Sequence, residues 1–396
     1  MVAAVDPYLI DWLDLAFRFL HVIAAIVWIG TSFYFVALDN HLRPAKERDE
    51  LTGESWEIHG GGFYRIEKFR VTPPTIPEPL HWYKWEAYTT WLSGFALFVS
   101  LYYLQPRTYL IDTSVADISP AVAIGASIAL LAVGWLVYDG LCRTVGKRSE
   151  RALAAIGVVL VGVTAYGVSH LLAPRAAYLQ IGAMLGTIMV ANVFFVIIPA
   201  HWELIRAKEA GREPDPAAGA RGKERSVHNN YLTLPVLFAM LSNHFAFTYT
   251  HEDSWIVLVC LMVIGAAIRH FFNLRHQGRN VWAIPVAAAI ALAGIAVWLR
   301  PPETSSAGPQ VPFSQVRAIV DQRCTVCHSM QPTQPGFSSP PRGIAFDTPE
   351  QIAARASAIE QQAVVLKSMP LGNVTHMTQA ERDALGTWIS QGANIR

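Results

Sequence analysis

Residues 178–200 read YLQIGAMLGTIMVANVFFVIIPA and contain no charged side chain. A helix needs about 20 mostly apolar residues to cross a bilayer, because each residue rises ~1.5 Å and the hydrocarbon core is ~30 Å thick. Seven other runs of the chain have a similar length and composition. The sequence therefore predicts an all-α, eight-helix transmembrane bundle, with spans at 10–38, 86–104, 119–138, 152–172, 178–200, 231–249, 254–272 and 281–299.

The composition of the 396-residue chain is typical of a protein in contact with lipid. Hydrophobic residues make up 52% of it and charged residues only 15%, against about 25% charged in an average soluble domain. The 31 Lys and Arg nearly balance the 30 Asp and Glu. A protein that binds nucleic acid through phosphate contacts needs a basic surplus. We therefore exclude nucleic acid as a partner and expect the lipid bilayer instead.

Basic residues are distributed unequally between the loops on the two sides of these spans. The loops on one side carry twenty Lys and Arg, and the loops on the other side carry two, Arg107 and Arg175. By the positive-inside rule, the side with twenty is cytoplasmic. An even number of spans then places both termini outside, which in a bacterial inner membrane is the periplasm.

The composition changes after the last span. Residues 300–312 are rich in Pro, Ser, Thr and Gly, as in a flexible linker. The 84 residues that follow, 313–396, form a module that is small for independent stability unless something fills its core. We therefore expect a transmembrane domain over 1–299, the linker, and this module.

The module contains Cys324-Thr325-Val326-Cys327-His328, a C-x-x-C-H motif. In this motif two thiols bond to the vinyl groups of a porphyrin, and the adjacent His supplies an axial nitrogen to the iron. No second Cys/His pair follows at the spacing of a zinc site. The sequence therefore predicts one covalent haem c, held by Cys324 and Cys327, with His328 on the iron.

Two methionines, Met369 and Met377, compete for the sixth position on this iron. Met369 precedes Pro370, and the Met-Pro segment resembles the distal loop of small class I cytochromes c, so Met369 is the preferred ligand. Thr348 and Thr378 each fit the pattern of a residue that caps the start of a helix. The module is therefore expected to be a small all-α class I cytochrome c domain.

Two histidines interrupt otherwise apolar spans. Ionisable side chains inside membrane helices are costly and are often functional. His21 lies in the first span and His244 in the sixth, and the topology places both in the outer half of the membrane. A haem b bound between two helices needs two imidazoles at similar depth, which makes this pair its candidate iron ligands. Alternatively, each histidine hydrogen-bonds a neighbouring helix or lines a hydrated cavity.

The loop 39–85 is much longer than a connection between helices requires. It contains three glycines directly after His59, followed by the basic residues Arg65, Lys68 and Arg70. A triple glycine permits tight backbone turns or close approach of the backbone to a ligand, and the bases and neighbouring aromatic rings suit a flat heterocyclic anion. Composition alone is equally compatible with an amphipathic segment at the membrane interface.

Three segments and the C-terminal motif together are similar to one known family. The segments are FLHVIAAIVWIG at 19–30, WEIHGGGFY at 56–64 and LHWYKWEAY at 80–88. With the C-x-x-C-H module behind them, the chain resembles the bacterial membrane-bound urate oxidases over essentially its whole length. The resemblance implies oxidation of urate to 5-hydroxyisourate. It also implies that electrons leave through the cytochrome domain to an external acceptor, such as a soluble cytochrome c or a terminal oxidase, instead of forming peroxide.

This implied reaction gives roles to residues of the loop. Urate from the cytoplasm would meet the basic inner face, where Arg65, Lys68 and Arg70 attract and bind the anion. Oxidation with addition of a water oxygen needs a base, for which His59 and Glu67 are the catalytic candidates. Haem c lies across ~30 Å of hydrocarbon from this face, so a substrate site on the inner side requires a relay such as haem b.

Two other classes of function stay open from the residues alone. One is a membrane-anchored cytochrome c that carries electrons for a separate dehydrogenase or quinol site. The other is a transporter or sensor whose bundle binds a purine while the cytochrome reports redox state. Reduction of the purified chain by urate alone separates an oxidase from a carrier, and uptake of urate into vesicles without oxidation indicates a transporter.

Overall fold

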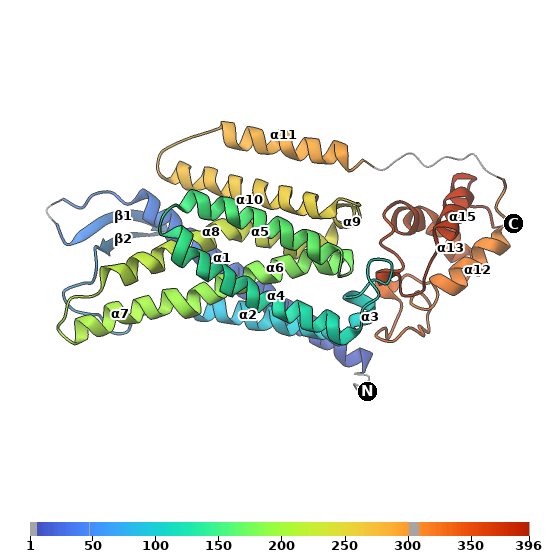
Figure 1. Ribbon diagram of the computed structural model, residues 1–396, viewed down its shortest axis with the longest axis horizontal. Helices are drawn as coiled ribbons and strands as arrows, with labels where there is room; N and C mark the ends of the chain where they lie inside the picture. The colour runs from blue at the N-terminus through green and yellow to red at the C-terminus, as the bar shows by residue number, and fades with distance from the viewer. Residues whose placement is uncertain (1–5, 47, 301–308, 396) are drawn as a thin grey trace.

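The computed structural model describes residues 6–46, 48–300 and 309–395. Figure 1 shows a bundle of long helices with a smaller helical module at one end. The linker expected over 300–312 lies largely outside the described residues and stays a prediction. The bundle's helices are α1 (Pro7–His41), α2 (Trp85–Phe98), α3 (Pro106–Tyr109), α4 (Pro120–Leu141), α5 (Glu150–Ser169), α6 (Pro174–Asn192), α7 (Ile198–Glu209), α8 (Pro216–Leu241), α9 (Ala246–Tyr249), α10 (Ser254–His276) and α11 (Ala283–Trp298).

Within the described residues, five helical stretches are long and apolar enough to cross a membrane. They are Tyr8–His41, Pro120–Gly146, Glu150–Ser169, Pro174–Glu209 and Ser254–His276. The expected spans 86–104 and 281–299 are helical too, but their helices are shorter. α2 has 14 residues before it continues into a π-helical turn at Val99–Tyr103, and α11 has 16 residues.

The expected span 231–249 differs from the structure at both ends. α8 begins fifteen residues earlier, at Pro216, because the Asp215 side chain caps it by accepting a backbone N–H of the first turn. α8 ends at Leu241, and a 3₁₀ turn at Ser242–His244 leads into α9. The polar first half of α8 packs against α7 and against the π-helical turn that follows α6. Apolar length alone does not predict such a helix.

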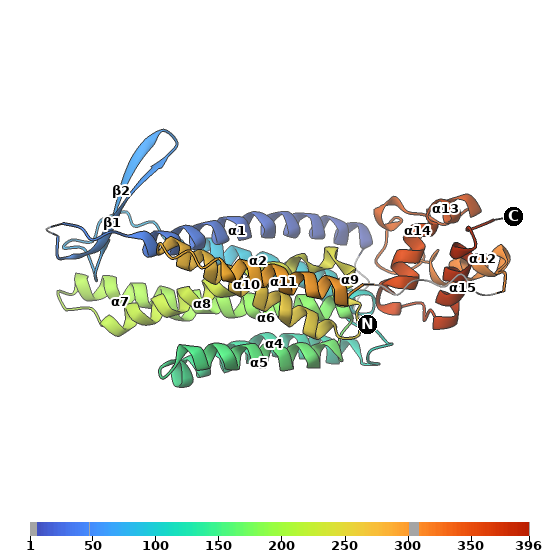
Figure 2. The same ribbon diagram turned by 90° about the horizontal axis from the view of Figure 1, so that it is seen from above.

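The all-α expectation needs correction in the segment between α1 and α2. This segment forms an antiparallel hairpin of β1 (Leu51–His59) and β2 (Gly62–Phe69). Its turn residues, Gly60 and Gly61, have φ of 58° and 82°, as a two-residue type I′ turn requires. Figure 2 shows the hairpin projecting away from the bundle.

The hairpin and the C-terminal module lie at opposite ends of the bundle (Figure 1). α1 begins at the end that carries the module and runs toward the hairpin, and α10 runs in the same direction before α11 returns. The start of α1 and the module therefore share one end, as the expected even number of crossings requires.

α6 is the most extensively buried of the long helices and contacts α4, α5 and α8. Gly182 permits the contact with α8, because an added Cβ would lie 2.7 Å from the Cβ of Ala239. Small residues bring neighbouring helices close in this way. The packing around α6 thus fixes the positions of the helices that carry the polar side chains described below.

The module contains α12 (Phe313–Arg323), α13 (Pro349–Ala354), α14 (Ala356–Ile359) and α15 (Gln379–Ser390). The expected caps are confirmed: Thr348 and Thr378 each form a capping box with the residue three positions later. α12 and α15 pack together around the buried side chains of Val316, Val320, Leu385 and Trp388.

Candidate functional site

The C-x-x-C-H motif lies on the turn that ends α12. The N–H of Cys324 donates to the Val320 carbonyl at 2.8 Å, and the N–H groups of Cys327 and His328 both donate to the Cys324 carbonyl, at 3.1 and 2.8 Å. Both cysteines are free thiols. Burial raises the pKa of Cys324 to about 12 and that of Cys327 to about 11, so both are neutral at pH 7. The turn therefore presents two uncharged thiols and an imidazole from one short segment.

The ring of His328 is oriented as in an iron ligand. Its Nδ1 donates a hydrogen bond to the carbonyl of Ile344 at 2.9 Å, which leaves Nε2 as the lone-pair nitrogen. Metal-binding histidines commonly have this arrangement, because the second hydrogen bond fixes the tautomer and the ring orientation. Phe346 packs beside the ring, with 5.2 Å between the centroids. These residues fit a covalently attached haem.

The two candidate sulfur ligands differ in their surroundings. Met377 is only 4% exposed and packs within the core of the module. Met369 is half-buried at the edge of that core. Its N–H donates to the Gln362 carbonyl at 3.0 Å, and its carbonyl accepts from the buried Arg382 guanidinium at 2.7 Å. The backbone at Met369 is thus held in place while the side chain stays at the core's edge, which favours Met369 as the ligand.

The module contacts the bundle through α3 and the neighbouring loop residues. The turn after Met369, Leu371–Asn373, packs on α3, and an added Cβ at Gly372 would lie 2.8 Å from the carbonyl oxygen of Ile111. Ser338 of the module donates a hydrogen bond to Asp11 of α1 at 2.7 Å. The methionine loop therefore rests directly on the bundle.

The loop that follows the cysteine turn meets the same part of the bundle, where an added Cβ at Gly336 would overlap the side chain of Gln105, the residue before α3. Burial raises the pKa of the Tyr109 phenol on α3. Burial lowers the pKa of Arg382, and the bundle's Asp112 carboxylate opposes this. The methionine loop and the loop after the motif thus both contact the bundle.

The structure places the predicted substrate residues on the hairpin and does not bring them into one pocket. His59 is exposed beside the turn, opposite Gly62, and Glu67 lies five residues further along β2. At ~3.4 Å per residue these two positions are about 17 Å apart. The geometry therefore does not allow His59 and Glu67 to act together on one small ring, and their catalytic role stays a prediction.

The basic side chains of the hairpin form ion pairs and hydrogen bonds with other residues of the chain. Arg65 forms ion pairs with Glu54 at 2.7 Å and with Glu67 at 3.1 Å. Lys68 pairs with Asp39 of α1 at 2.5 Å, and Arg70 donates to the Leu51 carbonyl at 3.1 Å. These contacts stabilise the hairpin and fasten it to the end of α1. Binding of substrate by Arg65, Lys68 and Arg70 stays a prediction.

The two histidines predicted to bind haem b contact different helices. His21 of α1 packs on α2, where its Nδ1 donates to the Thr90 carbonyl at 2.9 Å. An added Cβ at Gly94 would lie 2.7 Å from its ring. His244 is exposed on the turn after α8, next to Asn243, which accepts from Arg175 of α6. His21 thus has an Nε2 free to accept, but no contact brings the two rings together.

A buried polar network, which the sequence reasoning missed, joins α4, α6 and α8. Asn192 of α6 donates to the Tyr138 hydroxyl at 3.1 Å and to Asn229 at 2.8 Å. Arg225 forms an ion pair with Asp139 at 2.7 Å while only 4% exposed. The sequence reasoning counted Arg225 among the basic inner loops. The sequence does carry a signal for the network: Arg225 and Asn229 lie one helical turn apart, so both polar side chains share one face of a helix.

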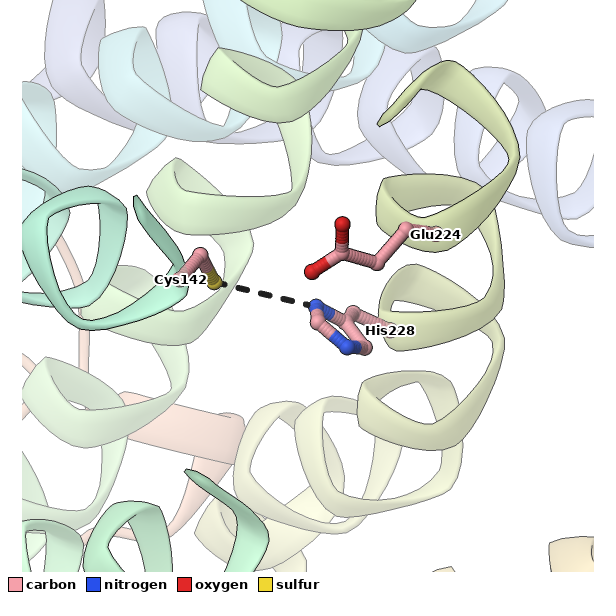
Figure 3. Close-up of side chains that lie close together, drawn as sticks. All are labelled: Cys142, Glu224 and His228. Atoms are coloured by element: carbon pink, nitrogen blue, oxygen red, sulfur yellow. Dashed lines mark hydrogen bonds between the residues drawn. The ribbon is translucent and has the colours of Figure 1, made fainter. Parts of the chain in front are cut away.

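Cys142, Glu224 and His228 lie at the edge of this network and point toward one another (Figure 3). Their ligand atoms lie within 4.8 Å of one another, a spacing compatible with a metal ion. However, the Nδ1 of His228 that faces this group is hydrogen-bonded to the Tyr138 hydroxyl at 2.7 Å. The Arg225 guanidinium also lies over the Tyr138 ring. A neighbouring positive charge disfavours a cation, so we interpret the cluster as part of the network.

The described chain is thus a mostly helical protein whose long apolar helices suit a membrane, with a helical C-terminal module that carries the C-x-x-C-H turn. The family model described as urate oxidase N-terminal matches residues 7–300, the extent of the bundle, and the chain belongs to this family. The family indicates a urate-related oxidoreductase. No curated protein and no solved structure was found to match the chain.

Proposed function

We propose that the chain is a membrane-bound urate oxidase of the bacterial inner membrane, with both termini in the periplasm. It converts urate to 5-hydroxyisourate and passes the electrons to a haem c attached to its own C-terminal module. An external acceptor, such as a soluble cytochrome c or a terminal oxidase, then takes them. The family match over the bundle supports the substrate, and the apolar helices support the location.

One observation carries the electron-transfer part of the proposal. The methionine loop and the loop that follows the motif, which are far apart in sequence, both meet the bundle at or beside α3, through Gly372 and Gly336. A cytochrome that only carried electrons between other proteins would keep this face open for them. A module that receives electrons from its own bundle is instead expected to turn this face toward the bundle, and the contacts of Gly372 and Gly336 with the bundle support this arrangement.

The residues of the module have separate tasks in this scheme. Cys324 and Cys327 would hold a haem through thioether bonds, and His328 and Met369 would be the ligands of its iron. The haem supplies one-electron redox chemistry, and a methionine ligand raises its potential. Arg382 holds the backbone at Met369, which keeps the sulfur in place.

The balance of the reaction explains why an external acceptor is needed. Urate and water give 5-hydroxyisourate, two electrons and two protons, and one haem stores a single electron. The relay predicted between an inner substrate site and the haem, a haem b on His21 and His244, stays part of the proposal. A pyridine haemochrome spectrum that contains c-type haem alone excludes this relay.

The electron count tests the proposed function. The purified chain, mixed in air with urate and an excess of oxidised soluble cytochrome c, is expected to reduce two cytochromes per urate and to form no peroxide. Catalase should not change the yield. One peroxide formed per urate, with the cytochrome left oxidised, would show an oxygen-dependent oxidase and overturn the proposal.

A further inference from the structure

Four buried polar atoms with no hydrogen-bond partner gather between α8 and α10. They are Nδ2 of Asn230, Nη2 of Arg269, Oδ1 of Asn273 and Nδ1 of His276, and they make up four of the seven such atoms in the described residues. Arg269, Asn273 and His276 share one face of α10, since they are spaced i, i+4 and i+7. Arg269 donates through Nε to Asn230 of α8 at 2.5 Å. We call these four residues the α8–α10 polar cluster.

Within the residues that the structure describes, the positive charge of this cluster has no carboxylate partner. Arg269 is 4% exposed, and its guanidinium lies over the ring of Phe33 of α1, 3.7 Å from the centroid. In the described part of the chain it forms no ion pair with a carboxylate, whereas the equally buried Arg225 pairs with Asp139 at 2.7 Å. A buried charge that lacks a partner is strongly destabilising. The cluster therefore has the electrostatics of a site for an anion.

The unpaired atoms also specify which hydrogen-bond donors and acceptors the anion must carry. Arg269 and Asn230 offer N–H donors, Asn273 offers an acceptor, and His276 can serve as either. A fully ionised phosphate or sulfate has no donor for Asn273. A planar anion that carries both carbonyl oxygens and ring N–H groups satisfies all four. Urate at neutral pH is such an anion.

The cluster lies toward the end of the bundle that carries the hairpin, because α10 runs to that end (Figure 2). α1 ends beside it: Gln277 donates to Asn40 at 3.2 Å, and His41 hydrogen-bonds Ser55 of β1 at 3.1 Å. The basic strand β2 is fastened at the same place through the pair of Lys68 and Asp39. A ligand approaching the cluster from this end would pass the base of the hairpin.

We propose that the α8–α10 polar cluster is the urate-binding site, with Arg269 as the residue that binds the anionic charge. This assignment rests on the proposed function and adds the location of its substrate. It also explains why an arginine is buried in an apolar bundle at the cost of its hydration.

Arg269→Gln tests the assignment against Arg275→Gln, which removes the same charge from an exposed position on the last turns of the same helix. Binding of radiolabelled urate is measured by anaerobic equilibrium dialysis, with the haem reduced beforehand so that urate is not consumed. Loss of a charge-assisted hydrogen bond is expected to weaken binding by about 10- to 100-fold in Arg269→Gln. Arg275→Gln is expected to stay within twofold of the unchanged chain.

Asn273→Asp provides the second variant and separates binding from folding. The new carboxylate pairs with Arg269, so the variant is expected to unfold at a higher temperature and to lose urate binding. A merely structural cluster would gain the same stability without any loss of binding. If Arg269→Gln fails to assemble, this variant alone decides the assignment.

The outcomes separate the site from the function. If the unchanged chain reduces its haem with urate, but Arg269→Gln and Asn273→Asp bind urate normally, the site is wrong and the function stands. If the unchanged chain neither binds urate nor is reduced by it, the proposed function fails and this assignment fails with it.

Discussion

Replacing Cys324 and Cys327 together by serine is expected to abolish urate-driven electron transfer completely. In the proposed arrangement each thiol would form one thioether bond to the porphyrin, and a hydroxyl cannot replace it. Both side chains lie on the single turn after α12, so no other cysteine can take their place there. Staining for haem after denaturing electrophoresis is expected to be negative, and reduction of soluble cytochrome c by urate is expected to fall to the background rate.

Cys260→Ser is the matched control, because Cys260 is a free thiol of α10 outside the module. This variant is expected to keep both the haem stain and the activity. A positive stain in the double variant would contradict the covalent haem.

The absorption spectrum of single methionine variants assigns the sixth ligand of the iron. Loss of the weak sulfur–iron band in Met369→Ala supports Met369. Survival of the band in that variant would move the ligand to Met377.

Gly372→Ala is expected to slow electron transfer from the bundle to the module by about 5- to 100-fold. Its Cβ would lie 2.8 Å from the Ile111 carbonyl oxygen and 3.0 Å from that of Thr108, both on the bundle. Overpacking of this kind costs ~1–3 kcal/mol, and each ~1.4 kcal/mol changes a population tenfold. The module therefore leaves its docked position more often. The rate of haem reduction after mixing with urate measures the effect.

Gly343→Ala controls for the backbone strain of this change. Gly343 has a φ of 66°, close to the 57° of Gly372, but an added Cβ there meets nothing within 4 Å. Both variants are expected to lose similar stability of the module, since alanine is strained at positive φ in each, and only Gly372→Ala should slow the transfer. Equal rates in the two variants would contradict the docked arrangement.

The apolar runs predicted the helices of the bundle well, because the length and composition of a span are local properties. Each of the eight expected segments contains a helix, and the capping boxes at Thr348 and Thr378 are confirmed. The hairpin was missed although its signal was present. Gly60-Gly61 between two runs rich in aromatic and β-branched residues fits a type I′ turn, whereas the triple glycine on its own predicts a tight turn or a close approach to a ligand, without the two strands.

The polar cluster could not be predicted in the same way, because it depends on contacts between helices. Asn230 and Arg269 are 39 positions apart, and only the packing of α8 against α10 brings them together. In the sequence, Arg269 contributes simply to the count of basic residues on one side. The contact of Gly372 with the bundle at α3 is equally hard to predict from the sequence, since it joins two separate parts of the chain.

Anaerobic mixing of the purified, oxidised chain with urate in a stopped-flow spectrometer tests the central claim most directly. We expect the visible α band of a reduced c-type haem to appear with urate as the only added reductant, with a b-type band before or alongside it if the relay is a haem b. If the haem stays oxidised until a second protein is added, the module is a carrier for another enzyme, and the claim that this chain oxidises urate is wrong.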